Sequence, residues 1–250
     1  MDAAWGQFIA GFSWLEYLCM GLMVLIGAAM QGIGGVGYAM FCAPLAAIFF
    51  PALVPGPLLA VGTPLAMLAY LREREALSGR VAAATLVGRI IGTGAAAALL
   101  VFFSASMLSV LFAALILIAV LLSSIGWRVE PSTCNLSIAG VASGIMGTIT
   151  AAGGPPFAIA MQHLPPPTMR STLGVVFFAG TIVSLVALAW IGRMGPQEWL
   201  YCVVLVPWML VGFLISTRFA QRISKALVRQ WLLGTASISA LVILAKVGLQ

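Results

Sequence analysis

The sequence predicts an all-α integral membrane protein, a polytopic helical bundle with two inverted repeats, each containing broken or re-entrant short helices. Composition is the first observation, since 62% of the 250 residues are hydrophobic and only 7% are charged. Second, apolar runs repeatedly reach the ~20 residues that span hydrocarbon. Third, two glycine- and proline-rich segments interrupt these runs at matching positions. No stretch resembles a soluble domain, so we expect a single membrane domain over residues 1–250.

We expect ten hydrophobic elements, arranged as two sets of five. The first set lies at about 15–31, 38–50, 54–71, 80–103 and 107–126, and the second at about 134–150, 154–163, 168–192, 196–217 and 226–247. Runs such as 81–103 and 107–125 lack the short-range alternation that is typical of a transmembrane β-barrel. The second element of each set has only about 10 to 13 residues, too few to cross the bilayer alone. Each of these is therefore predicted to be a half-helix, a re-entrant piece or a strongly tilted segment.

The distribution of lysine and arginine predicts the orientation. If each short element returns the chain to its starting side, the loops on one side hold Arg72, Arg74, Arg80, Arg128, Arg170, Arg218, Arg222, Lys225 and Arg229. The other side holds only Arg193 and Lys246. The richer side is predicted to be cytoplasmic, in a bacterial inner membrane, with both termini periplasmic. A count of eight full spans fits worse, because it puts the 72–80 and 218–229 loops on opposite sides.

Five elements per set is an odd number, so the second set enters the membrane from the opposite face. Repeat one is expected at about 15–126 and repeat two at about 134–247, as an inverted-topology repeat. The two interrupted segments are Gln31–Pro44 and Ser143–Pro156. Residues 31–46 and 143–158, which are related by a shift of 112 residues, are identical at six of 16 positions. Glycine and proline at corresponding depths in two halves indicate the binding site of a secondary transporter.

The acidic residues argue against a cation as substrate. They are Asp2, Glu16, Glu73, Glu75, Glu130 and Glu198, and all lie in loops or at element ends. Cation carriers commonly use a carboxylate within a membrane span, and none of the predicted elements has one near its middle. Arg89, in contrast, follows Arg80 by nine residues, about 13.5 Å along a helix, which is close to the midplane. Its guanidinium is expected either to attract an anion or to bond carbonyls freed by a broken helix.

Backbone donors are expected at both interrupted segments. Gly153-Gly154-Pro155-Pro156 is typical of a turn leading into a helix that starts with proline, and a helix start is a ready anion site. Gln31, Thr148 and Thr150 add neutral donors, and Gly34, Gly35 and Gly37 allow the backbone to approach a ligand. The alternative for these small residues is close helix packing.

His163 and Arg170 are the remaining candidates. His163, the single histidine, is expected to be a surface or capping residue or a proton-coupling group. Arg170 is either a cytoplasmic anchor or a substrate-binding residue. The four cysteines are dispersed and are expected to be buried hydrophobes. We therefore expect no metal, no cofactor and no nucleic acid, and as partners a small anion, membrane lipid and, as an open alternative, a second copy in a homodimer.

Three patterns together resemble the sulfite exporter TauE/SafE family. They are Gln31-Gly-x-x-Gly-x-Gly with Pro44-Leu45, then Gly140-x-x-x-Gly144-x-x-Gly147 with Gly153-Gly-Pro-Pro156, and Arg170-Ser-Thr-Leu173. The resemblance covers nearly the whole chain and implies transport of sulfite, thiosulfate or organosulfonates such as sulfoacetate. Gly147-Thr-Ile-Thr-Ala-Ala is less glycine-rich than in many relatives, and no family motif includes Arg89.

The sequence thus predicts a secondary transporter, not an enzyme, that exports sulfite or a sulfoacetate-like organosulfonate by alternating access. Binding is expected near the midplane between the two halves. A passive anion channel and an intramembrane enzyme are the alternatives, although the enzyme would have only His163 as a histidine base.

Overall fold

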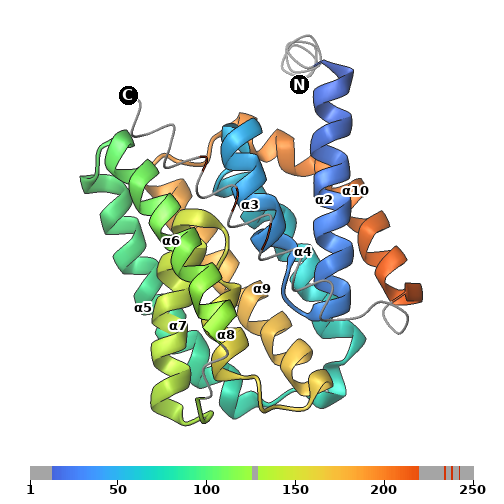
Figure 1. Cartoon of the computed structure of the whole chain (residues 1–250), viewed down its shortest axis with the longest axis vertical. Helices are drawn as coiled ribbons and strands as arrows, with labels where there is room; N and C mark the ends of the chain where they lie inside the picture. Colours follow the sequence, from blue (N-terminus) through green and yellow to red (C-terminus); the bar gives the residue numbers. More distant parts are fainter. Residues whose placement is uncertain (1–12, 126–128, 220–233, 235–237, 239–241, 243–250) are drawn as a thin grey trace.

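The computed structural model describes residues 13–125 and 129–219, together with residues 234, 238 and 242. Within these residues the regular structure is helical throughout, with no strand. The helices, drawn in Figure 1, are α2 (Trp14–Gly34), α3 (Tyr38–Phe49), α4 (Gly56–Arg72), α5 (Gly79–Phe102), α6 (Ala105–Ile125), α7 (Thr133–Thr150), α8 (Gly154–Ala160), α9 (Pro166–Trp190) and α10 (Pro196–Phe219). Two 3-10 turns, η1 (Pro51–Leu53) and η2 (Arg74–Ala76), precede and follow α4.

Nine of the ten predicted elements correspond to these helices, and the tenth, at 226–247, lies mostly outside the described residues. Two of these helices, α2 and α7, begin at a serine whose side chain caps the helix N-terminus. Ser13 accepts a hydrogen bond from the Leu15 N–H (3.3 Å) while Glu16 accepts one from the Ser13 N–H (3.4 Å), which forms a capping box for α2. The Ser132 hydroxyl likewise accepts from the Asn135 N–H (3.2 Å) at the start of α7.

Four helices in the described part of the chain are long and apolar enough to cross a membrane. They are Trp14–Gly34, Gly79–Phe102, Pro166–Trp190 and most of α10, Pro196–Arg218. The two helices expected to be short are short: α3 has 12 residues and α8 has seven. At 1.5 Å per residue α8 covers only about 10 Å, roughly a third of the hydrocarbon thickness.

Three helix pairs make the most extensive contacts in the bundle: α5 with α7, α2 with α10, and α4 with α9. The α5–α7 crossing is very close, because a Cβ added to Gly88 would collide with the Ser137 carbonyl and one added to Gly92 with that of Val141. Gly140 and Gly144 have the same role on α7. These spaced glycines let two backbones touch, which is how helices associate where burial of apolar surface gives no net driving force.

Both interrupted segments reverse the chain inside the bundle. Helix α2 ends at Gly35, whose φ of +80° is left-handed, and Gly37, with a φ of +153°, precedes α3. Helix α7 ends instead at Ala151, a left-handed residue that is not glycine (φ 62°), before α8 begins. The ends of α2 and α7 therefore meet the starts of α3 and α8 within the protein, where the freed backbone is shielded from lipid.

Candidate functional site

Arg89 lies in the middle of α5 and is almost completely buried, with 1% of its surface exposed. Its Nη1 donates a hydrogen bond to the Ser143 hydroxyl at 2.6 Å, and its guanidinium carbon lies 5.4 Å from the centre of the Phe177 ring. The Nε atom is buried and has no hydrogen-bond partner. Neither ion pair in the described residues includes Arg89, so its positive charge has no carboxylate beside it.

Three glycines from different parts of the chain provide the space that the guanidinium fills. A Cβ on Gly180 of α9 would collide with the Arg89 Nε and Cδ atoms. One on Gly153 would come within 3.0 Å of Nη1, and one on Gly147 within 3.2 Å of Nη2. The arginine therefore fits only because α7, the α7–α8 turn and α9 lack side chains where they meet it.

Ser143 holds this arrangement together. Its hydroxyl accepts from Arg89 and donates to the Gly153 carbonyl at 2.6 Å. The carbonyl freed by the broken helix is thus bonded by the serine. The sequence suggested that Arg89 could donate to such a carbonyl. In the structure Ser143 is the residue that donates to it. Ser143 was not among the predicted site residues, yet it occupies the position equivalent to Gln31 in the 112-residue shift, a signal that the sequence did contain.

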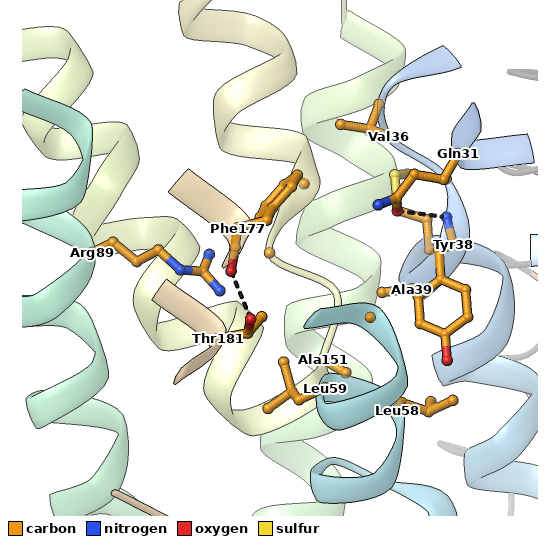
Figure 2. A pocket seen from close by; sticks show the side chains of 15 residues that line it. Gln31, Val36, Tyr38, Ala39, Leu58, Leu59, Arg89, Ala151, Phe177 and Thr181 are labelled. Atoms are coloured by element: carbon orange, nitrogen blue, oxygen red, sulfur yellow. Dashed lines mark hydrogen bonds between the residues drawn. The ribbon is translucent and has the colours of Figure 1, made fainter. Parts of the chain in front are cut away.

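A cavity of about 40 Å³ lies beside the guanidinium, between α5, α9, α4, the start of α3 and the α7–α8 turn (Figure 2). A single water needs roughly 10–15 Å³ by the same kind of measure, so a small polyatomic ion fits. Five predicted site residues line the cavity: Gln31, Gly37, Arg89, Gly153 and Gly154. In Figure 2, Arg89 reaches in from one side, and Gln31 and Tyr38 lie on the other.

The start of α3 faces this cavity through Gly37, Tyr38, Ala39 and Met40. The first backbone N–H groups of a helix have no partner within it, and they carry the positive end of the helix dipole. The Gln31 side-chain oxygen accepts one of them, from Tyr38 at 3.3 Å. The Tyr38 hydroxyl is buried and has no hydrogen-bond partner. The first interrupted segment therefore brings a helix start to the cavity.

The second interrupted segment contributes fewer donors than the sequence led us to expect. Helix α8 does begin at Gly154-Pro155-Pro156. Because proline has no N–H, only Gly154 among these three carries a backbone donor. Pro155 and Pro156 are buried but do not line the cavity. The main contribution of this segment is the space that Gly153 leaves for Arg89.

Thr148 and Thr150 are buried away from the cavity lining. The Thr148 hydroxyl bonds those of Ser184 (2.8 Å) and Thr93 (3.3 Å), which joins α7, α9 and α5 one turn from Arg89. The Thr150 hydroxyl donates to the Met146 carbonyl at 2.7 Å within its own helix. These hydroxyls hold the helices in register around the arginine.

The other predicted residues lie near the ends of helices. Gly34 and Gly35 close α2, and a Cβ on Gly35 would approach Arg170 to 2.7 Å. Arg170 binds Glu73 through two nitrogens, at 2.9 and 2.7 Å, so its charge is paired. His163 is exposed, in a surface depression that Glu130 also lines. None of these four predicted residues lines the cavity beside Arg89.

Sequence reasoning missed Ser143, Phe177, Gly180 and Tyr38. An isolated glycine, phenylalanine or tyrosine in an apolar helix has no pattern that separates it from packing residues. Only the fold brings Gly180, 91 residues further along the chain, against Arg89.

The chain was compared with known proteins and protein families. No curated protein and no solved structure matches the chain. The profile of the family described as sulfite exporter TauE/SafE matches residues 19–243, nearly the whole of the 250-residue chain. This match agrees with the apolar helices of the described residues. The protein is therefore a multi-pass membrane transporter and belongs to the sulfite exporter TauE/SafE family.

Proposed function

We propose that this protein is a secondary transporter that exports a small sulfur oxyanion, sulfite or an organosulfonate, across a bacterial inner membrane. The anion binds in the cavity between α3, α5 and α9, against Arg89 and the start of α3. Family membership supports the substrate class. One structural observation carries the site: a 1%-exposed guanidinium beside a cavity, with no carboxylate partner among the described residues.

The energetics of Arg89 support an anion in this cavity. A guanidinium at the centre of a membrane helix costs about 2.5–3.5 kcal/mol on insertion scales. One hydrogen bond to Ser143 and one aromatic face offset only part of this cost. A small oxyanion would supply the missing charge and would accept from the donors that Ser143 leaves unused. Arginine is well suited to this, because its planar fork matches the oxygens of an oxyanion.

We further propose that the two halves form an inverted repeat and that alternating access comes from one half rocking against the other. The packing supports this. The repeat would pair α2 with α7, α4 with α9, and α5 with α10. Under this pairing the α5–α7 contact corresponds to the α10–α2 contact, and the α4–α9 contact corresponds to itself. These three contacts are the most extensive in the bundle. In Figure 1, α2 runs down from the N-terminal end while α7 runs up.

Cysteine labelling tests the topology. Ala76 lies in η2 and His163 follows α8, whereas Ala52 lies in η1. We expect cysteines at 76 and 163 to react from the cytoplasm, and a cysteine at 52 to react from the periplasm. Labelling of positions 76 and 163 from opposite faces would contradict the inverted arrangement.

The substrate assignment is tested with Arg89→Gln and Arg89→Lys in proteoliposomes, alongside melting of the same purified proteins. Arg89→Gln should reduce sulfite or sulfonate binding at least about 100-fold, about 2.7 kcal/mol, while the protein still inserts. Arg89→Lys should keep part of the activity, because a point charge attracts an anion without the bidentate fork. Arg193→Gln, which removes an exposed arginine near α10, is the matched control.

Normal anion affinity in folded Arg89→Gln would remove Arg89 from the site. Flux measured with and without a pH gradient tests the mechanism on the same vesicles. Accumulation of the anion against its gradient supports a carrier, and a passive leak at all gradients would favour a channel.

A further inference from the structure

The charges around the cavity define what kind of anion it can hold. Among the described residues that line it, Arg89 is the one with a formal charge. The neutral polar side chains of the lining are Gln31, Tyr38 and Thr181. Thr181 already donates to the Phe177 carbonyl at 2.7 Å, and Gln31 accepts from the Tyr38 N–H. In the part of the chain that the structure describes, the lining therefore offers one full positive charge and no second cation.

Beside the start of α3, one part of the wall across from Arg89 is apolar. Leu58 and Leu59 of α4 and Ala39 of α3 lie across the cavity from the guanidinium in Figure 2, and Val36 lies above them. Leu58 and Leu59 are almost fully buried, with 1% and 3% of their surfaces exposed. A charged group placed against this wall would lose its hydration and gain no partner, which is strongly unfavourable.

We infer that the cavity selects anions that carry a single negative charge, with the oxyanion head at Arg89 and a short uncharged tail against Leu58 and Leu59. This inference rests on the proposed function and narrows its substrate class to monoanions. The cavity of about 40 Å³ restricts the tail to a few atoms. A dianion such as sulfoacetate would neutralise Arg89 with its sulfonate and leave its carboxylate unpaired against the apolar wall. It should therefore bind more weakly than a monoanion of the same shape.

A matched pair of ligands tests this on the intact wild-type protein. Sulfoacetate and its amide, sulfoacetamide, have nearly the same shape and differ by one negative charge. Competition with methanesulfonate counterflow in proteoliposomes, at a pH where both ligands are fully ionised, should show sulfoacetamide to be at least tenfold the stronger competitor. Equal competition, or stronger competition by sulfoacetate, would overturn the inference while leaving anion transport intact. Absence of counterflow and of binding for every sulfur oxyanion would overturn the proposed function and this inference with it.

A second cation at Val36 tests the same point by reversing the preference. Val36 lies between α2 and α3, is only partly buried and lines the cavity, so a longer side chain can be accommodated. Val36→Lys should raise the competition by sulfoacetate relative to sulfoacetamide at least tenfold. Val36→Gln, of similar length and without charge, should leave the ratio near that of the wild type. If the Val36→Lys protein elutes and melts like Val36→Gln but keeps the wild-type ratio of competition by the two ligands, the inference is overturned. If Val36→Lys does not fold, the competition ratio measured on the wild-type protein decides.

Discussion

The two interrupted segments share a sequence pattern but have different structural roles in the folded protein. The first, around Gln31–Tyr38, turns the start of a 12-residue helix toward the cavity and bonds its first N–H with the Gln31 oxygen. The second, around Ser143–Pro156, starts a seven-residue helix with two prolines that have no N–H to offer. Its polar residue, Ser143, binds Arg89 and a carbonyl of its own turn.

This difference shows that glycine in such a motif can serve a ligand in two ways. Near Gly37 it lets the backbone reverse so that helix α3 points at the cavity. At Gly147 and Gly153 it removes side chains, so that a cation from another helix can occupy the space. One segment is expected to supply backbone donors and the other to position the charge. Three predictions separate these roles.

The largest effect is expected when the cavity is filled from the second segment. A Cβ on Gly154 would lie 3.5 Å from Val36, an ordinary contact, so Gly154→Ala should keep most of its transport. The longer side chain of Gly154→Leu extends into the cavity and should abolish transport with expression retained. Gly34→Leu is the matched control in the first segment, because Gly34 does not line the cavity and a Cβ there meets nothing within 4 Å. Equal flux in Gly154→Leu and Gly34→Leu would reduce the second segment to a packing feature.

A smaller effect is expected from crowding the guanidinium without entering the cavity. Gly180→Ala places a Cβ where the Arg89 Nε lies, and overpacking of this kind costs about 1–3 kcal/mol. The arginine should shift, and anion affinity measured by calorimetry or flux should fall about tenfold or more. Gly94→Ala on α5 is the control, since its Cβ meets nothing within 4 Å and alanine favours a helix. If Gly180→Ala binds the anion as well as Gly94→Ala does, the position of the guanidinium does not determine affinity.

The third prediction concerns an interaction energy in protein stability, which distinguishes the two polar residues. Double-mutant cycles on protein stability with Arg89→Gln should give Ser143→Ala a coupling of about 1.5–3 kcal/mol, the range for a hydrogen bond to a charged group. Gln31→Ala should give a coupling below about 0.5 kcal/mol, because Gln31 bonds its own segment. Similar couplings for both serine and glutamine would mean that the two segments act on Arg89 alike.

Much of the architecture was predictable because it depends on periodicity and composition. The nine helices in the described part of the chain follow the hydrophobic runs, and the two predicted short elements are short. The family resemblance, carried by the glycine motifs and Arg170-Ser-Thr-Leu173, is confirmed by a match over residues 19–243. The distance of Arg89 from Arg80 predicts a position near the midplane, since position along a helix fixes depth, and this depth remains a prediction. The inverted repeat remains a prediction that the helix packing supports.

The site was predictable only in part. The sequence by itself determined the membrane class, the two interruptions of the hydrophobic runs and the lack of a carboxylate near Arg89 in the chain, because these depend on residue type and spacing. The tertiary structure decided which groups meet: Ser143 and Gly180 against Arg89, Glu73 against Arg170, and Tyr38 opposite the guanidinium. It also decided that Thr148 bonds Ser184 instead of lining the cavity. Such contacts join residues up to 97 positions apart, and no local pattern encodes them, because the crossing points of the helices fix which side chains come together.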